Sequence, residues 1–179
     1  YAAALTSYDS FLKLVPDHAM IMVNRANTLR GLGRFDDAIA AYDAALAKEP
    51  NYAEGHYNRA LALSEMRRLE ESLAGYDRAI AARPDFTIAL TNRGNVLREL
   101  GRRDEAMDSY ARSLELDPRN PNTHYNCGVT LNELGRPDEA LASYDQALAL
   151  APQFTPALTN RANLLKATGR MDAALADYE

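Results

Sequence analysis

Residues 90–118, LTNRGNVLRELGRRDEAMDSYARSLELDP, contain two helical patterns separated by a Gly-Arg break. Before the break, apolar or small residues recur at the spacing of an α-helix, at Leu90, Gly94, Leu97 and Leu100. After the break the same spacing recurs at Ala106, Tyr110, Ser113 and Leu114. Spacings of three and four place these side chains on one face of a helix. The segment therefore predicts two helices joined by a short turn.

The same pattern returns along the whole chain at one constant interval, the distance in sequence from Pro16 to Pro50. Five prolines keep this interval, Pro16, Pro50, Pro84, Pro118 and Pro152, and so do six tyrosines, Tyr8, Tyr42, Tyr76, Tyr110, Tyr144 and Tyr178. A single helix pair cannot bury its apolar surface alone, so neighbouring pairs must stack on it. The sequence therefore predicts an all-α fold, an α-solenoid of antiparallel helix pairs.

The period divides the chain, as a single array over residues 1–179, into predicted repeats. We expect a partial repeat with only a second helix at 1–18, a truncated repeat at 155–179, and four full repeats at 19–52, 53–86, 87–120 and 121–154. Terminal repeats normally carry a polar cap. Since neither end here looks like one, we expect either a segment of a longer array or ends that pair with other copies.

The turn inside each repeat is expected at a glycine, which can take the left-handed conformation that ends a helix. The glycines are Gly33, Gly101, Gly135 and Gly169. Arg67 holds the equivalent place, so we expect a strained or differently shaped turn there. Small residues on the first helix, Ala26, Ala60, Gly94, Gly128 and Ala162, are predicted to face small residues on the second, Ala38, Ser72, Ala106, Ala140 and Ala174.

The period, the glycine break, the small residues, the tyrosine and the closing proline resemble the tetratricopeptide repeat family, and the resemblance covers the whole chain. It implies a right-handed superhelical α-solenoid that binds other proteins. Where that family often has an early aromatic residue, this chain has Met22, His56, Leu90, His124 and Leu158. Where it usually has leucine three residues later, this chain has Arg25, Arg59, Arg93, Cys127 and Arg161.

One asparagine recurs in the first helix of every repeat, at Asn24, Asn58, Asn92, Asn126 and Asn160. Asparagine costs about 0.5 kcal/mol relative to alanine inside a helix, so its recurrence needs a reason. Its amide has one acceptor and two donors, which suits the backbone of an extended peptide. With layers about 10 Å apart and a peptide rise of about 3.3 Å per residue, each amide would contact roughly every third ligand residue. Alternatively, each amide bonds to a neighbouring helix or turn and only sets the register of the stack.

The series resembles the asparagine ladder in the superhelical repeat region of O-GlcNAc transferases, which implies a peptide-binding role. Asn27, Asn95 and Asn163 lie one turn further along the same face. A second period, twice the repeat interval, adds Arg30, Arg98 and Lys166 in the same repeats, and places Tyr57 and Tyr125 beside the asparagine of the alternating ones. Duplication of a two-repeat unit and selection for an alternating ligand both explain this period.

Composition and spacing argue against other classes. The net charge of -5 without a basic stripe argues against a nucleic-acid partner, and no apolar run of about 20 residues is present to span a membrane. The single cysteine, Cys127, excludes an intrachain disulfide and favours a reducing compartment, so we expect a cytoplasmic protein. His56 and His124, about 20 Å apart by layer spacing, cannot share a metal. We expect no metal, no cofactor, no catalytic residue and no enzymatic activity.

The leading hypothesis is a protein–protein interaction scaffold that binds an extended peptide or protein segment in its concave groove through the asparagine side chains. Two alternatives remain open. The chain could be the substrate-recognition arm of a larger glycosyl- or sulfotransferase, or a self-assembling structural module that stacks end to end.

Overall fold

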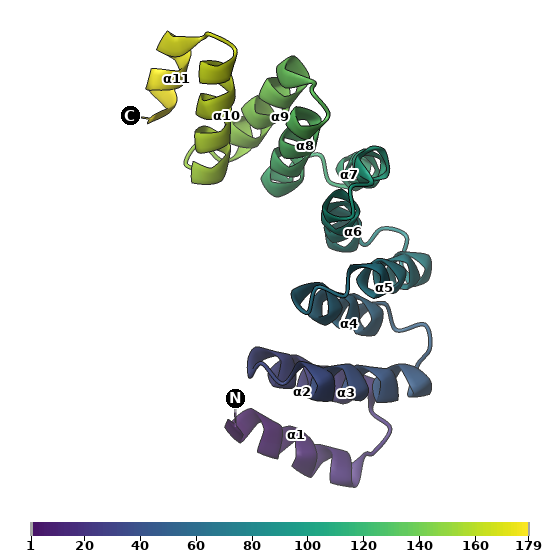
Figure 1. Cartoon of the computed structure of the whole chain (residues 1–179). Helices are drawn as coiled ribbons and strands as arrows, with labels where there is room; N and C mark the ends of the chain where they lie inside the picture. Colours follow the sequence, from purple (N-terminus) through teal and green to yellow (C-terminus); the bar gives the residue numbers. More distant parts are fainter. Residues whose placement is uncertain (1, 179) are drawn as a thin grey trace. The chain divides into compact units, whose positions relative to one another are not determined.

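The computed structural model describes residues 2–178 and, within them, eleven α-helices and no strand (Figure 1). The helices are α1 (Ala2–Leu14), α2 (Ala19–Gly31), α3 (Phe35–Lys48), α4 (Ala53–Glu65), α5 (Leu69–Ala82), α6 (Thr87–Glu99), α7 (Arg103–Leu116), α8 (Pro121–Glu133), α9 (Pro137–Leu150), α10 (Thr155–Ala167) and α11 (Met171–Tyr178). The predicted all-α fold of helix pairs is confirmed. Tyr1, Glu179 and the side chains of Ala176 and Tyr178 lie outside the description, so the sixth periodic tyrosine is not placed.

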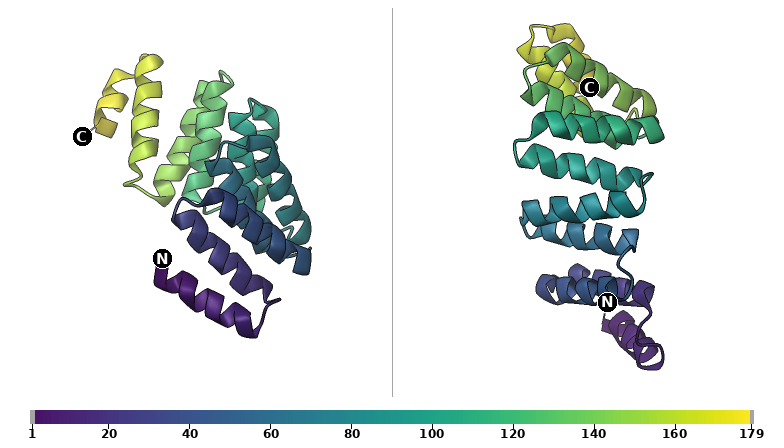
Figure 2. Two further views of the ribbon diagram at one scale, coloured as in Figure 1. Left: turned by 60° about the horizontal axis from the view of Figure 1, so that its bottom comes forward. Right: turned by 90° about the vertical axis from the view of Figure 1, so that its right-hand side faces the viewer.

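The chain forms two compact units, unit 1 (Tyr1–Val96) and unit 2 (Leu97–Glu179), and the boundary between them falls inside α6. In unit 1 the helix pairs α2 with α3 and α4 with α5 pack together, and in unit 2 the pairs α8 with α9 and α10 with α11 do so. Within each unit, successive helices run antiparallel and side by side (Figure 2). The even-numbered helices are the predicted first helices of the repeats, and the odd-numbered ones are the second helices.

The periodic tyrosines form the centre of the core. Tyr42, Tyr76, Tyr110 and Tyr144 are buried, whereas Tyr8 is half-buried. In unit 1 Tyr42 packs with Leu29 and Leu63, and in unit 2 Tyr144 packs with Leu131. Burial raises the pKa of Tyr42 to about 12 and that of Tyr144 to about 12. Both hydroxyls therefore stay protonated at neutral pH and can donate hydrogen bonds.

Small residues allow the two helices of a pair to touch, as the sequence predicts. Ala26 and Ala38 are fully buried in unit 1, and so are Ala60 and Ser72. The Ser72 hydroxyl on α5 donates to the Ala60 carbonyl oxygen on α4 over 2.8 Å. A side-chain bond to the backbone of the facing helix is possible only at close approach, so these positions set the distance between α4 and α5.

The turn glycines take the predicted left-handed conformation, with φ of 73° at Gly33, 78° at Gly101, 73° at Gly135 and 80° at Gly169. Arg67 has φ of 61°, so the expected strain is present. The turn is not differently shaped, however. The Arg67 N–H donates to the Ser64 carbonyl oxygen over 2.9 Å, as the Gly135 N–H does to that of Asn132 over 3.0 Å.

Replacing Arg67 with glycine is expected to stabilise unit 1 by about 1 kcal/mol, because a left-handed residue with a Cβ costs about 1–2 kcal/mol and the extra entropy of glycine in the unfolded chain offsets part of the gain. Urea unfolding followed by circular dichroism measures the change. The matched control is Gly135→Arg, expected to destabilise by a similar amount. A glycine at 67 that leaves the midpoint unchanged would show that the turn stores no strain.

The end helices keep apolar side chains in solvent. In α1 Leu14 is 83% exposed, and in α11 Leu175 is 61% exposed. Single exposed apolar side chains are common on protein surfaces and do not by themselves indicate association. The predicted end-to-end association therefore stays a prediction that measurements of size against concentration can test.

Candidate functional site

The five asparagines of the predicted series lie on the first helices and are all half-buried. Asn24, Asn58 and Asn92 belong to unit 1, on α2, α4 and α6, and Asn126 and Asn160 belong to unit 2, on α8 and α10. Every first helix thus carries one amide of this series in a half-buried position.

The five amides do not have the same partners. The Asn58 Nδ2 donates to the Glu54 carbonyl oxygen over 2.8 Å. The Asn92 Nδ2 donates to the Tyr57 hydroxyl oxygen over 3.1 Å, and the Asn160 Nδ2 donates to that of Tyr125 over 3.0 Å. The Asn92 amide also interacts with the Tyr76 hydroxyl, and the Asn160 amide with that of Tyr144. In all three asparagines the Oδ1 acceptor is left.

Asn24 and Asn126 differ from the other three. Among residues 2–178 their side chains have no hydrogen-bonding partner, and only their carbonyl oxygens accept bonds, from the hydroxyls of Thr28 and Thr130. A half-buried amide without a protein partner bonds to water or to a ligand. Equal spacing in sequence therefore does not give these five residues equal roles.

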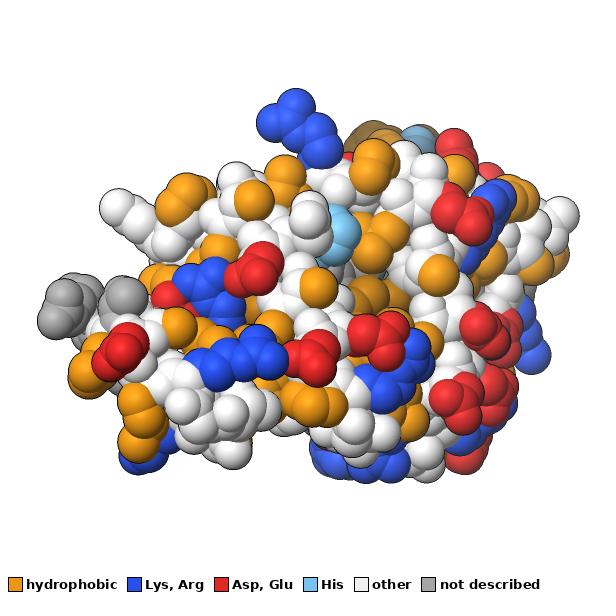
Figure 3. All heavy atoms as spheres, turned by 90° about the horizontal axis from the view of Figure 1, so that it is seen from above, with side chains coloured by type: hydrophobic (Ala, Val, Ile, Leu, Met, Phe, Trp, Pro, Cys, Tyr) orange, Lys and Arg blue, Asp and Glu red, His pale blue; other side chains and the backbone are white. Residues whose placement is uncertain are grey.

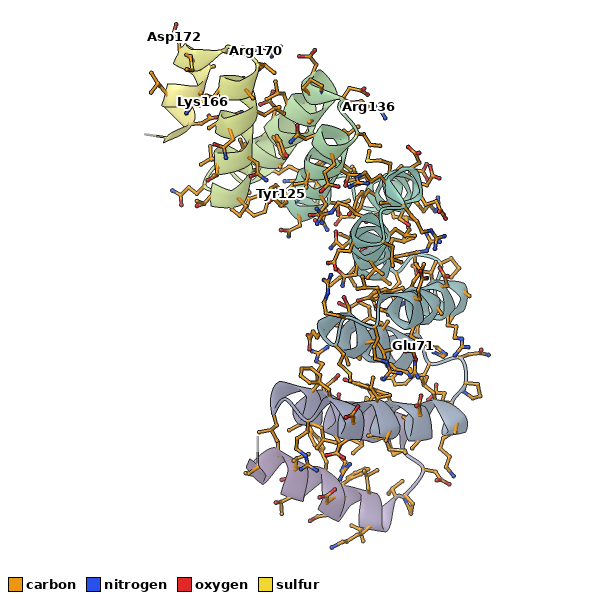
Figure 4. The ribbon with its side chains drawn as sticks, in the orientation of Figure 1. Glu71, Tyr125, Arg136, Lys166, Arg170 and Asp172 are labelled. Atoms are coloured by element: carbon orange, nitrogen blue, oxygen red, sulfur yellow. The ribbon has the colours of Figure 1, made fainter. Side chains whose placement is uncertain are left out.

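The polar residues one helical turn after the series differ from one another in exposure. The Tyr42 hydroxyl donates to the Asn27 Oδ1 over 2.5 Å, so Asn27 completes the core of unit 1. Asn95 is half-buried, whereas Asn163 and Lys166 are exposed on α10. Figure 4 labels Lys166 and, on α8, Tyr125.

Within each unit, side chains of one first helix bond to side chains of the next first helix. In unit 1 the Arg30 Nε lies 3.9 Å from the Glu65 Oε2, and Tyr57 bonds to Asn92. In unit 2 the Arg98 Nη1 donates to the Glu133 Oε1 over 3.0 Å, and Tyr125 bonds to Asn160. The two-repeat period of the sequence thus appears as alternating ionic and hydroxyl–amide links.

Tyr57 and Tyr125 also contact neighbouring rings. The Tyr57 ring centroid lies 5.1 Å from that of Phe86 and 5.9 Å from that of Tyr76. Burial raises the pKa of Tyr57, and the hydrogen bond with Asn92 opposes part of that rise. The Tyr57 hydroxyl accepts from Asn92 and, among the described residues, has no acceptor for its own hydrogen. That hydrogen is available to water or to a ligand.

A row of arginine–aspartate pairs is a feature that the sequence analysis missed. The arginines that replace the usual leucine bond to aspartates on the preceding second helix. The pairs are Arg25 with Asp9 at 2.6 Å, Arg59 with Asp43 at 2.6 Å, Arg93 with Asp77 at 2.6 Å, and Arg161 with Asp145 at 2.5 Å. The signal in the sequence was an aspartate directly after the periodic tyrosine in these repeats.

The fourth layer lacks both partners, since Cys127 and Ala111 stand in the two positions. Burial raises the pKa of the Cys127 thiol to about 12, so this thiol is a poor nucleophile at neutral pH. Across residues 2–178, no three or more His, Cys, Asp or Glu side chains lie together where they could hold a metal ion.

Two of the histidines, His56 and His124, support turns. The His56 Nε2 lies 2.8 Å from the Pro50 carbonyl oxygen, and the His124 Nε2 lies 3.0 Å from that of Pro118. Because a carbonyl oxygen only accepts, the ring nitrogen carries the hydrogen in each case. Each histidine thus holds the loop that precedes its own helix.

The surface carries both signs of charge. In Figure 3, lysine and arginine side chains lie next to aspartate and glutamate side chains over the face shown, and no large basic patch is visible there. None of the helices within residues 2–178 has the length and apolar character needed to cross a membrane.

The helix pairs, left-handed turns and small contact residues define a helical-repeat protein. One family model, described as TPR repeat, matches residues 26–66 and 94–135, and two models described as tetratricopeptide repeat match residues 121–154 and 53–86. These matches cover more than half of the chain. The chain belongs to the tetratricopeptide repeat family.

Solved structures share the fold at low sequence identity. MamA 41-end from Desulfovibrio magneticus RS-1 has a TM-score of 0.82 at 16% identity, covering 90% of this chain and 92% of that one. YrrB, described as a TPR protein with an unusual peptide-binding site, has a TM-score of 0.77 at 21% identity, covering 95% and 88%. The pilF protein of Pseudomonas aeruginosa has a TM-score of 0.82 at 20% identity, covering 89% and 73%. No curated protein sequence matches the chain.

Proposed function

We propose that this chain is a non-catalytic interaction scaffold that holds an extended peptide or protein segment against its first helices through asparagine side chains. The observation that carries the proposal is the pair of half-buried amides, Asn24 and Asn126, that have no partner among residues 2–178. The three bonded amides, on α4, α6 and α10, donate through Nδ2, and their Oδ1 atoms accept no bond among the described residues. All five positions can therefore contribute to binding.

An extended peptide is the ligand whose chemistry fits. Each of its residues offers one N–H and one C=O, and an asparagine amide can pair with both. Tyr57 and Tyr125 add hydroxyl donors beside the amides of Asn92 and Asn160. Such contacts recognise the backbone, so affinity should depend weakly on the ligand's side chains at those points.

The proposal predicts a specific loss on mutation. Peptides selected from a displayed library of random linear sequences should bind the chain, and Asn126→Ala should weaken a selected peptide by about 1 kcal/mol, or roughly fivefold, because one net hydrogen bond is lost. Asn24→Ala should have a similar effect. Isothermal titration calorimetry measures the affinity, with circular dichroism to confirm unchanged helicity.

Gln146→Ala is the matched control, since Gln146 is an exposed amide on the second helix α9 and lies outside the series. It should leave the affinity unchanged. Selected peptides that bind the Asn24→Ala/Asn126→Ala double variant as tightly as the parent chain would refute the asparagine role. A library that yields no peptide would count against the scaffold itself.

A further inference from the structure

Two turns of the chain carry the same aromatic contact, one in each unit. The turn between α5 and α6 places the Phe86 ring 5.1 Å from that of Tyr57. The turn between α9 and α10 places the Phe154 ring 5.2 Å from that of Tyr125. The two turns occupy equivalent positions in alternate repeats of the sequence. The two turns are therefore related, although their ring pairs meet at different angles, 43° in unit 1 and 63° in unit 2.

In unit 1 an arginine of the chain itself lies on the phenylalanine ring of this turn. The guanidinium carbon of Arg83 lies 3.6 Å from the centroid of the Phe86 ring, over its face. The Arg83 Nη1 donates to the Glu54 Oε1 over 2.8 Å. A ring face attracts a cation through its quadrupole, and the carboxylate fixes the cation in place. The turn of unit 1 thus holds a guanidinium between a ring and an acid.

In unit 2 the related turn lacks this arginine. Ala151 stands where unit 1 has Arg83, and the exposed Asn122 stands where it has Glu54. An open cavity of about 550 Å³ lies there, lined by Ala151, Pro152, Gln153 and Phe154. Unit 2 thus keeps the aromatic ring, Phe154, but has no arginine at the position of Arg83 to lie on it.

We propose that this cavity is a subsite for an arginine side chain of a bound polypeptide, whose guanidinium stacks on Phe154. Guanidinium is planar and weakly hydrated, so it stacks on a ring more readily than the compact ammonium of lysine. Asn122 is not among the residues that line the cavity, so stacking on Phe154 is the contact on which the proposal rests. The chain's net charge of -5 also favours a cationic partner.

The subsite can be tested on the full chain with a blocked Gly-Arg-Gly peptide, observed by NMR. Saturable shifts of the Phe154 ring and the Gln153 amide signals are expected, with a dissociation constant of roughly millimolar order. The same peptide with citrulline, which has the shape of arginine without its charge, should bind roughly fivefold more weakly. Equal binding of the two peptides would overturn the proposal.

Three variants separate the subsite from a general effect on folding. Ala151→Arg should fill the cavity with the chain's own guanidinium, as Arg83 does in unit 1, and abolish the shifts. Arg83→Ala should open the related turn in unit 1 and add a second set of shifts at Phe86. Asn122→Glu should tighten binding by up to roughly fivefold, as a partly exposed ion pair does. Peptide binding that persists in Ala151→Arg would refute the subsite.

The outcome is independent of the asparagine role. The readout is at Phe154 and Gln153 in the turn before α10, and none of the three variants changes an asparagine of the series. A positive result with Gly-Arg-Gly and a failed peptide selection would retain the subsite and reject the extended-peptide scaffold. A failed Gly-Arg-Gly titration together with a successful peptide selection would reject the subsite and retain the extended-peptide scaffold.

Discussion

Replacing Gly128 with alanine is expected to destabilise unit 2 by about 2 kcal/mol, a typical cost of adding a methyl group to a well-packed core. A Cβ at Gly128 would lie 2.5 Å from the Cε1 and 2.6 Å from the Cδ1 of Tyr144. The Tyr144 ring is only 1% exposed and packs against Tyr125, so it cannot move aside without disturbing the core. This clash outweighs the roughly 1 kcal/mol that alanine contributes over glycine inside a helix. Urea unfolding followed by circular dichroism measures the loss.

Gly55→Ala is the matched control for that variant. A Cβ at Gly55 would lie 2.9 Å from the Cδ2 of Leu46, the far end of a flexible side chain, and 3.2 Å from the Cδ1 of Tyr52, so its closest contact is looser than the one at Gly128. We expect Gly55→Ala to be neutral or stabilising, within about 1 kcal/mol. Equal destabilisation of the two variants would show that the Tyr144 contact is not the cause.

The helix pairs and their close contacts could be predicted because both partners lie within one repeat. Ala60 and Ser72 are close in sequence, and the hydrogen bond between them joins α4 and α5 of the same pair. The left-handed turns follow equally from local sequence, since glycine stands at four of the five places and only Arg67 departs from it. Short-range pattern thus determines the fold of each repeat.

The contacts between repeats could not be predicted in the same way. Arg59 in place of leucine looked like a departure from the family pattern, because its partner Asp43 lies on the second helix of the preceding repeat. Which atoms meet there depends on how one repeat stacks on the next. A constant spacing shows that a position is repeated, but it does not show what the position touches.

The candidate site shows the same limit. The asparagines are evenly spaced, so the sequence favours one shared role for all of them. Where an asparagine bonds to a tyrosine, the tyrosine comes from the preceding first helix, and it occurs there only in alternate repeats. Asn92 therefore meets the Tyr57 hydroxyl. One repeat later, Thr91 stands at the position of Tyr57, and Asn126 has no side-chain partner among the described residues.

The layer without an arginine–aspartate pair offers a direct test of what these pairs contribute. Cys127→Arg alone is expected to destabilise unit 2 by about 2 kcal/mol, because a guanidinium would enter a position that is 6% exposed and lacks a carboxylate. Ala111→Asp alone should change stability by less than about 0.5 kcal/mol, since Ala111 is exposed. Together they should recover more than about 1 kcal/mol of the loss, roughly the strength of a charge-assisted hydrogen bond.

The coupling energy from this double-mutant cycle, measured by urea unfolding, is the decisive quantity. In unit 1 the Arg59 Nε lies 2.6 Å from the Asp43 Oδ1, and in unit 2 the Arg161 Nη1 lies 2.5 Å from the Asp145 Oδ1. The restored pair should reproduce that geometry and lose part of its coupling in high salt. Ala111→Asn, which keeps the shape but not the charge, should rescue Cys127→Arg less well than aspartate does. Equal rescue by the two, or none by either, would mean that the pairs do not stabilise the stacking of one repeat on the next.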